Sequence, residues 1–255
     1  MRAVNEVMFD CSLRGLGILN YESMRWTGEL FLVSKLMRNI IDGDKLVCVD
    51  VGANIGEYAE MVLGYYPDAS LICIEPHPLN FSQLHERQRL KEQILLQCAA
   101  GAEAGELTLF DRADAAGEGS QHASLHKKVI TDLHKQNVVQ FRVKIISLDS
   151  LVLERKIASI DLLKIDTEGH ELEVLHGASY ILENKIAKVI HIEFNEMNVI
   201  SRVFLRDIKD KLHDYKAFRL LPNGMIRIPD APLYSELFGF QNIVFIRNDL
   251  QWACL

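Results

Sequence analysis

Residues with the chemistry of a nucleoside-binding site follow two apolar segments of the chain. The segment 47–51 leads into the turn Gly52-Ala53-Asn54-Ile55-Gly56. Glycines let the main chain bend there and leave backbone N–H groups open to a ligand at the start of a helix. An acid at the tip of the next strand, here Glu75, can accept hydrogen bonds from a ribose diol. The predicted residues that bind a nucleoside-bearing cofactor are therefore Asp50, Gly52, Asn54, Gly56 and Glu75.

The details of the glycine turn select among such cofactors. The turn lacks the Gly-x-Gly-x-x-Gly pattern that admits the pyrophosphate of a dinucleotide. Asp50 would repel a pyrophosphate but could accept a hydrogen bond from an ammonium group. S-adenosylmethionine carries an amino-acid end, a sulfonium charge and a ribose, so acids at positions 50 and 75 suit it better than a nicotinamide cofactor. A turn that merely joins a core strand to a helix is the remaining interpretation.

Bulk properties narrow the classes of protein to which the chain can belong. Its 255 residues can form one α/β domain, and a formal net charge of −7 without a lysine or arginine block argues against nucleic-acid binding. Charged residues interrupt the first twenty positions, and no segment approaches the roughly 18 apolar residues of a membrane span. These features predict a cytoplasmic protein without a transmembrane segment. The sequence is compatible with a homo-oligomer.

Apolar segments alternate with segments of helical periodicity along most of the chain. This alternation predicts right-handed crossovers and a mainly parallel, doubly wound sheet. The expected strands are 46–51, 71–75, 94–98, 106–110, 141–146, 160–166, 188–194, 217–221, 225–228 and 242–247, and the expected helices are 22–41, 56–65, 78–91, 168–184 and 203–213. Residues 1–42 are predicted to form an N-terminal helical cap or lid, and residues 43–250 the cofactor-binding domain.

Several of these segments together resemble the FkbM-type methyltransferases. The similar segments are Asp50 to Gly56, Glu75-Pro76, Ser147 to Leu151 and, most specifically, Ile160 to Glu171 with its Lys-Ile-Asp-x-Glu-Gly core. The resemblance runs from about residue 28 to residue 247. It implies a class I S-adenosylmethionine-dependent methyltransferase with a Rossmann-like sheet of seven strands, the last antiparallel. It further implies transfer to a hydroxyl group, mostly of sugars or hydroxylated natural products.

One segment departs from the family pattern. Many members have an acid after the third strand, whereas this chain has Ala99-Ala100-Gly101-Ala102. Adenine is therefore expected to meet backbone carbonyl groups near Ala100, or the side chain of Glu103.

Methyl transfer to a hydroxyl requires an aligned acceptor and a destination for the hydroxyl proton. In a doubly wound fold the ligands lie at the carboxyl ends of the strands. Asp166, after the fourth core strand, is the leading candidate for base or metal ligand, and Glu168, His170 and Glu193 are further catalytic candidates. Asp166, Glu193 and Asn195 would offer the oxygen ligands that Mg²⁺ prefers.

The acceptor is the least constrained part of the prediction. A small-molecule or glycan acceptor could meet side chains with aromatic faces and polar tips. The candidates are Tyr21, Trp26, His122, Ser124, His126 and Phe194. Two other functions stay open at this point: a nicotinamide-dependent oxidoreductase, and a non-catalytic module that binds S-adenosylmethionine.

Overall fold

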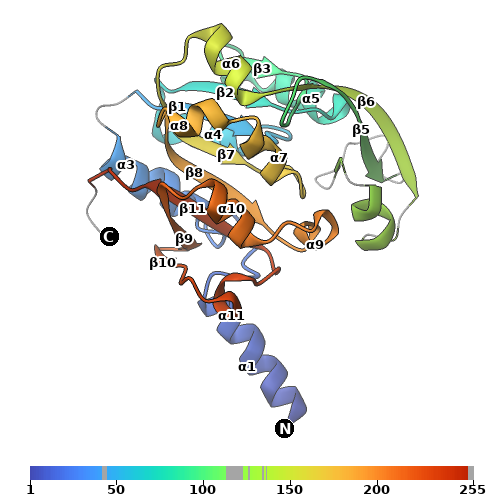
Figure 1. Cartoon of the computed structure of the whole chain (residues 1–255), viewed down its shortest axis with the longest axis vertical. Coiled ribbons are helices and arrows are strands. Elements are labelled where there is room, and N and C mark those ends of the chain that lie inside the picture. Colours follow the sequence, from blue (N-terminus) through green and yellow to red (C-terminus); the bar gives the residue numbers. More distant parts are fainter. Residues whose placement is uncertain (42–44, 113–122, 126, 134, 136, 252–255) are drawn as a thin grey trace.

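The computed structural model describes residues 1–41, 45–112, 123–125, 127–133, 135 and 137–251. Its strands form an eight-stranded sheet in the order β10-β9-β11-β8-β7-β1-β2-β3 and a three-stranded sheet in the order β4-β6-β5 (Figure 1). The large sheet contains β1 (Val47–Val51), β2 (Ser70–Ile74), β3 (Ile94–Leu96), β7 (Ile160–Ile165), β8 (Ala187–Phe194), β9 (Tyr215–Leu221), β10 (Gly224–Arg227) and β11 (Gln241–Arg247). The small sheet contains β4 (Ala99–Ala100), β5 (Gly105–Arg112) and β6 (Val138–Ile146).

The strand directions confirm the predicted doubly wound sheet. Strands β3, β2, β1, β7 and β8 are parallel neighbours, and the last strand, β11, runs antiparallel to β8 and β9. The sheet has eight strands rather than the seven that the resemblance implies, because β10 pairs with β9 as a hairpin at the edge. Asn223-Gly224, a dipeptide typical of two-residue hairpin turns, lies at the junction of the two strands.

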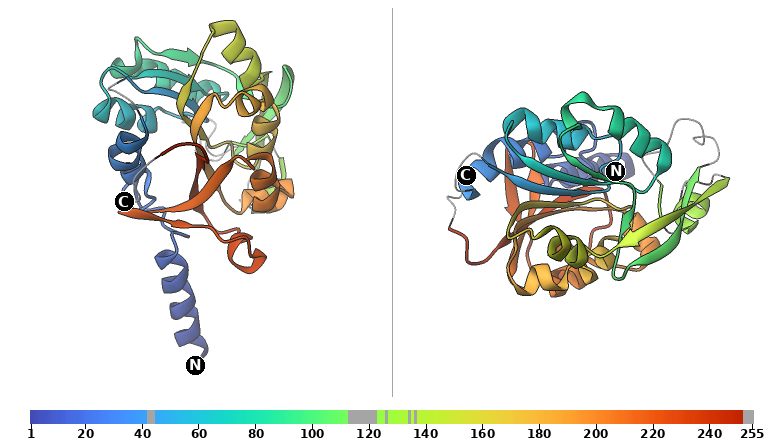
Figure 2. Two further views of the ribbon diagram at one scale, coloured as in Figure 1. Left: turned by 60° about the vertical axis from the view of Figure 1, so that its left-hand side comes forward. Right: turned by 90° about the horizontal axis from the view of Figure 1, so that it is seen from above.

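Helices cover both faces of the large sheet (Figures 1 and 2). One face packs its buried side chains against α6, α7, α8 and α10, and the other against the segment 29–40 with α4 and α5. The helices are α1 (Arg2–Gly15), α2 (Glu29–Phe31), α3 (Met37–Ile40), α4 (Glu57–Tyr65), α5 (Pro78–Glu86), α6 (Leu148–Arg155), α7 (Glu171–His176), α8 (Ser179–Glu183), α9 (Met197–Ser201), α10 (Leu205–Lys211) and α11 (Pro232–Ser235), with π-helical turns at Leu32–Leu36 and Val129–Leu133 and a 3₁₀ turn at Gln88–Leu90.

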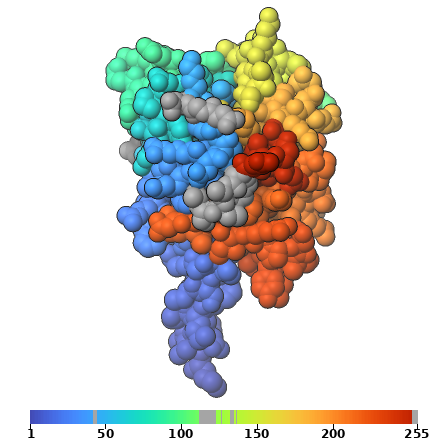
Figure 3. All heavy atoms as spheres, turned by 90° about the vertical axis from the view of Figure 1, so that its left-hand side faces the viewer, coloured from blue at the N-terminus to red at the C-terminus, as the bar shows by residue number. Residues whose placement is uncertain are grey.

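The N-terminal segment differs from the prediction in two ways. Helix α1 projects from the body and buries none of its residues (Figures 1 and 3). The predicted helix 22–41 begins only at Glu29, where the segment 29–40 joins the core of one sheet face. The sequence pattern did detect the buried residues of that segment, since they repeat at helical spacing. The proposed boundary between residues 42 and 43 stays a prediction.

The predicted helix 168–184 is interrupted. Helix α7 ends at His176 and α8 begins at Ser179, so the single helix was wrong. A methyl group at Gly177 would overlap the carbonyl oxygen of Gly101, so the chain between the two helices lies directly against the end of β4. The leucine periodicity continues through the interruption, and this periodicity is what the sequence pattern detected.

Candidate active site

The register of four neighbouring strands brings the candidate residues to one edge of the sheet. Val51, the last residue of β1, pairs with Ile74 in β2 and Ile165 in β7, and Ile165 pairs with Ile192 in β8. The next residue of each strand therefore stands at the carboxyl edge. These residues are Gly52, Glu75, Asp166 and Glu193, and all four line one cavity of about 620 Å³.

Glu75 is held by the backbone on both sides of its carboxylate. Its Oε2 accepts a hydrogen bond from the Asn54 N–H at 2.8 Å, and its Oε1 accepts one from the His77 N–H at 2.7 Å. Burial raises the pKa of Glu75 to about 7, although these two hydrogen bonds and His77 act in the opposite direction. The carboxylate is fixed in orientation and retains lone pairs for further donors. This geometry is suited to a vicinal diol.

Gly52 and Gly56 are required in the glycine turn for two different reasons. Gly52 has a φ of +82°, and a methyl group there would overlap the carbonyl oxygen of Asp166. Gly56 has a φ of +88°, and a methyl group there would lie 2.7 Å from Leu84 and 2.8 Å from Leu90. Gly52 therefore lines the cavity, whereas Gly56 serves the packing of α4 against its neighbours rather than the predicted approach of a ligand.

Asp50 does not line the cavity, in contrast to the direct ligand contact that the sequence predicted. Its side chain is 1% exposed and lies 3.9 Å from Lys164 Nζ. Burial raises the pKa of Asp50 to about 6, and Lys164 opposes that rise. The neighbouring position on β7 explains this contact, since Asp50 and Lys164 are register partners.

Lys164 connects this buried carboxylate to the cavity. Its Nζ donates a hydrogen bond to Asp166 Oδ2 at 2.8 Å and lies 5.0 Å from the centre of the Tyr58 ring. Burial disfavours its charge, but Asp166 and Asp50 outweigh burial and raise the pKa of Lys164. The ammonium group therefore stays charged and orients Asp166.

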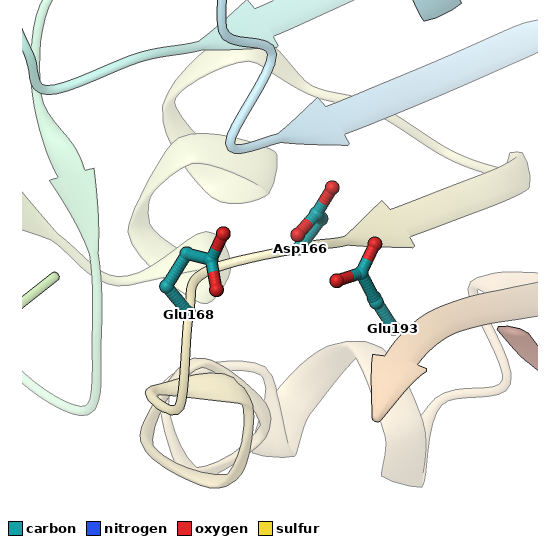
Figure 4. A group of neighbouring side chains, drawn as sticks. All are labelled: Asp166, Glu168 and Glu193. Carbon is teal, nitrogen blue, oxygen red and sulfur yellow. The ribbon is translucent and has the colours of Figure 1, made fainter. Parts of the chain in front are cut away.

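Three carboxyl groups converge at the carboxyl ends of β7 and β8 (Figure 4). One oxygen from each of Asp166, Glu168 and Glu193 lies within 4.8 Å of the others. Burial raises the pKa of Glu168 and of Glu193, and the charge of Asp166 raises both further. Such a group can hold a proton between carboxylates or bind a hard divalent cation.

Asn195 lines the cavity beside this cluster, and its predicted role as a metal ligand stays a prediction. Its Nδ2 donates to Glu193 Oε1 at 2.8 Å, while its Oδ1 accepts from the Met197 N–H at 2.8 Å. The oxygen that would bind a cation thus faces the backbone of α9. Glu168 takes the third position of the cluster.

Glu171 organises the loop that carries Glu168, a role that was not among the predictions. Its Oε1 accepts from the N–H and hydroxyl of Thr167, both at 3.1 Å, and from the Gly169 N–H at 3.0 Å. Its Oε2 accepts from Asn198 Nδ2 at 2.9 Å. Glu168 is thereby held at a φ of +54°, a left-handed conformation that is costly for a residue other than glycine. The signal for this role in the sequence was the position of Glu171 in the segment that resembles the family motif.

We expect Glu171→Gln to lower the free energy of unfolding by roughly 2 kcal/mol, because its amide nitrogen must face a donor on one side. Glu168 would also lose its fixed position, because the loop that holds it in the left-handed conformation would loosen. Urea denaturation followed by circular dichroism measures the first effect. Glu173→Gln, an exposed change in the same helix, should stay within about 0.5 kcal/mol of the parent protein. Equal stability of both variants would contradict this role for Glu171.

Some of the remaining candidate residues line the cavity and others do not. His170, Ala100 and Tyr21 line it, and the roles predicted for them stay predictions. Phe194 is fully buried in the core and Trp26 lines a separate surface cavity near α1, so the structure contradicts both as acceptor contacts. Ser124 is buried, and its hydroxyl donates to the Glu168 carbonyl oxygen at 2.8 Å. His122 and His126 lie outside the described residues.

Comparison with known proteins places this site in a sequence family. The model of the methyltransferase FkbM domain matches residues 50–217. A hexuronic acid methyltransferase, AglP of Haloferax volcanii, is 28% identical over 62% of this chain and 59% of its own length. The 2-O-methyltransferase NoeI of Sinorhizobium fredii is 24% identical over 80% of this chain and 86% of its own length. The chain spans 59% of each of several curated relatives.

A solved structure gives the same architecture. Methyltransferase FkbM from Methylobacillus flagellatus KT superimposes with a TM-score of 0.50 at 16% identity, over 85% of this chain and 47% of that chain. At this identity the likeness concerns the fold alone. Among the described residues, no helix combines the length and apolar character needed to cross a membrane.

Proposed function

Because the chain belongs to the FkbM methyltransferase family, we propose that it transfers the methyl group of S-adenosylmethionine to a hydroxyl group of a sugar or another hydroxylated metabolite. The proposal rests on the four residues that line the cavity at the carboxyl edge of the sheet, which are Gly52, Glu75, Asp166 and Glu193. Glu75, suited to a ribose, and the carboxyl cluster, suited to a hydroxyl proton, line the same cavity. Its volume of about 620 Å³ is within the range of small-molecule sites.

The residues present fit this cofactor. Glu75 offers both carboxylate oxygens to the ribose hydroxyls, and Gly52 leaves the backbone of the turn open to the cavity. Ala99 and Ala100, which form β4 after β3, also line the cavity, and small apolar residues there leave room for a planar base. When bound, S-adenosylmethionine supplies an electrophilic methyl group. A nicotinamide cofactor is disfavoured by the family and by the glycine turn.

The carboxyl cluster offers a route for the proton of the acceptor hydroxyl. Asp166, oriented by Lys164, stands next to the cofactor turn and can accept that proton directly. Glu168 and Glu193 can share it, because burial and the charge of Asp166 raise the pKa of both and so favour a protonated carboxyl group in the cluster. His170 lines the same cavity and is the second candidate base.

The sugar class of the acceptor rests on the relatives. AglP is named a hexuronic acid methyltransferase and NoeI a 2-O-methyltransferase. We propose the hydroxyl of a sugar for this chain because a cavity with several carboxyl groups can hydrogen-bond many hydroxyls. Cofactor binding without turnover would instead support the non-catalytic module.

Calorimetric titration with S-adenosylhomocysteine tests the cofactor. We expect its affinity to fall about tenfold between pH 8 and pH 6, because a ribose diol donates to the ionised carboxylate and Glu75 takes up a proton near pH 7. Glu75→Gln should bind weakly at both pH values. NAD⁺ serves as the control ligand and should not bind. Labelled methyl transfer to neutral glycosides, glycosides of hexuronic acids and hydroxylated lactones then tests the reaction.

The carboxyl cluster also fits Mg²⁺, which would lower the pKa of the acceptor hydroxyl. Asp166, Glu168 and Glu193 would hold it. We expect Mg²⁺ to raise the melting temperature of the protein at pH 8 and EDTA to reverse the rise, because a cation relieves repulsion among the three groups.

A substitution provides the matched test for the cation. A carboxyl group whose pKa is raised by folding stabilises the protein at low pH and loses that contribution as pH rises through the raised value. Glu193→Gln should therefore raise stability at pH 8 without Mg²⁺, by about 1 kcal/mol, and abolish the Mg²⁺ response. Glu196→Gln, an exposed neighbour, should keep that response. A melting temperature insensitive to Mg²⁺ would leave a metal-free base as the mechanism.

A further inference from the structure

The cavity has an apolar side and a charged side, and Glu75 lies between them. Ala99, Ala100 and Leu109 line one side with apolar groups. On the other side, β1 and β7 bring charged groups to the cavity, among them Lys164 and Asp166. A nucleoside with its ribose at Glu75 therefore directs its base toward the apolar side. Its 5′ substituent extends toward the charged side.

Lys164 is suited to a carboxylate on that charged side. It is the only lysine or arginine among the described residues that line the cavity. Its ammonium group has three N–H donors, and the contact with Asp166 uses one of them. Asp50 lies at 3.9 Å, beyond hydrogen-bond distance. A donor thus remains for an anionic group of a ligand.

Glu29 is the complementary group, at the start of α2. It lines the same cavity, and its charge interacts with that of Lys164. The Thr27 hydroxyl donates to one carboxylate oxygen, Oε2, at 2.9 Å. Burial raises the pKa of Glu29, while Lys164 and Thr27 favour its ionised form. The Glu29 carboxylate is therefore available to an ammonium group that enters the cavity.

The turn that presents Glu29 is held in place. Gly28 has a φ of +84°, and a methyl group there would lie 2.6 Å from Leu220 Cβ and 2.8 Å from the Leu221 carbonyl oxygen. The turn cannot move away from β9 without losing this packing. Glu29 is accordingly preorganised rather than recruited by the ligand.

We propose that Glu29 and Lys164 bind the amino-acid end of the cofactor, with Glu29 accepting from the α-ammonium group and Lys164 donating to the α-carboxylate. The assignment rests on the proposed function and moves the ammonium partner from the buried Asp50 to Glu29. It makes the N-terminal segment part of the cofactor site.

Two ligands that share the adenosine part separate this proposal from the proposed function. S-adenosylhomocysteine has the amino-acid end and 5′-methylthioadenosine lacks it. In calorimetric titrations Glu29→Gln should weaken S-adenosylhomocysteine roughly tenfold to a hundredfold, the range for a hydrogen bond between charged groups. It should leave 5′-methylthioadenosine within about twofold, because a change confined to the amino-acid end does not affect adenosine binding.

Further variants and a third ligand complete the design. Glu196→Gln, the same change in an exposed glutamate lining the cavity, should alter neither affinity. Decarboxylated S-adenosylhomocysteine keeps the ammonium group and should still lose affinity in Glu29→Gln. Lys164→Met should weaken S-adenosylhomocysteine but not its decarboxylated form; since this change also unpairs buried acids, Glu29→Gln decides the question.

The outcomes are distinguishable. If the parent protein binds neither adenosine ligand, the proposed function fails. If it binds both and Glu29→Gln weakens both equally, or weakens neither, the function stands and the assignment of Glu29 is overturned. Selective loss of S-adenosylhomocysteine supports the assignment.

Discussion

Replacing Gly52 with alanine is expected to lower the free energy of unfolding by roughly 2–5 kcal/mol. A β-carbon there would overlap the Asp166 carbonyl oxygen, and the φ of +82° is unfavourable for any residue with a side chain. The left-handed conformation costs about 1–2 kcal/mol and the overpacking about 1–3 kcal/mol. The end of β7 would have to move away from β1, although the Asp166 N–H donates to the Val51 carbonyl oxygen at 2.9 Å. Cofactor affinity should fall with stability, because the displaced loop lines the cavity.

The chain contains a matched control for this change. Gly64 lies inside α4, and a methyl group there would meet nothing within 4 Å. Gly64→Ala should be neutral or stabilise the protein by about 0.5–1 kcal/mol, because alanine has the higher helix propensity. Urea denaturation of both variants compares them directly. Equal midpoints for Gly52→Ala and the parent protein would show that β1 and β7 separate without cost.

The parts of the site that the sequence predicted are those that depend on strand ends. Gly52, Glu75, Asp166 and Glu193 each follow an apolar segment, and parallel strands align their carboxyl ends. Knowing the strands was therefore sufficient to bring these four residues together. The family resemblance added the antiparallel last strand, which periodicity alone does not determine.

The parts that were wrong depend on contacts between distant segments. Asp50 alternates with Val49 and Val51, which pack on one sheet face, so its side chain points to the other face, beside Lys164. The sequence showed the alternation but not the neighbouring strand. Gly177 ends α7 against the carbonyl of Gly101, a contact between residues 76 positions apart that no local pattern records. Glu171 is similar, since Asn198 reaches it from α9.

The second large effect is expected at Asp166. Asp166→Asn keeps the shape of the side chain but removes the charge, so it can neither accept the acceptor's proton nor bind a cation strongly. We expect kcat for methyl transfer to fall roughly 10²–10⁴-fold, the usual contribution of a general base. The affinity for S-adenosylhomocysteine should change only a few-fold, because Glu75 and the glycine turn are untouched.

The ratio of these two effects is the informative quantity. A base acts in the transition state, so its loss lowers kcat far more than it changes cofactor binding. Asp210→Asn, an exposed change on α10, should leave both values unaltered. If Asp166→Asn retains turnover while Glu193→Gln or His170→Gln removes it, the base lies elsewhere in the cavity and Asp166 serves to hold Lys164. If Asp166→Asn loses cofactor affinity in proportion to kcat, its carboxylate belongs to the cofactor site instead.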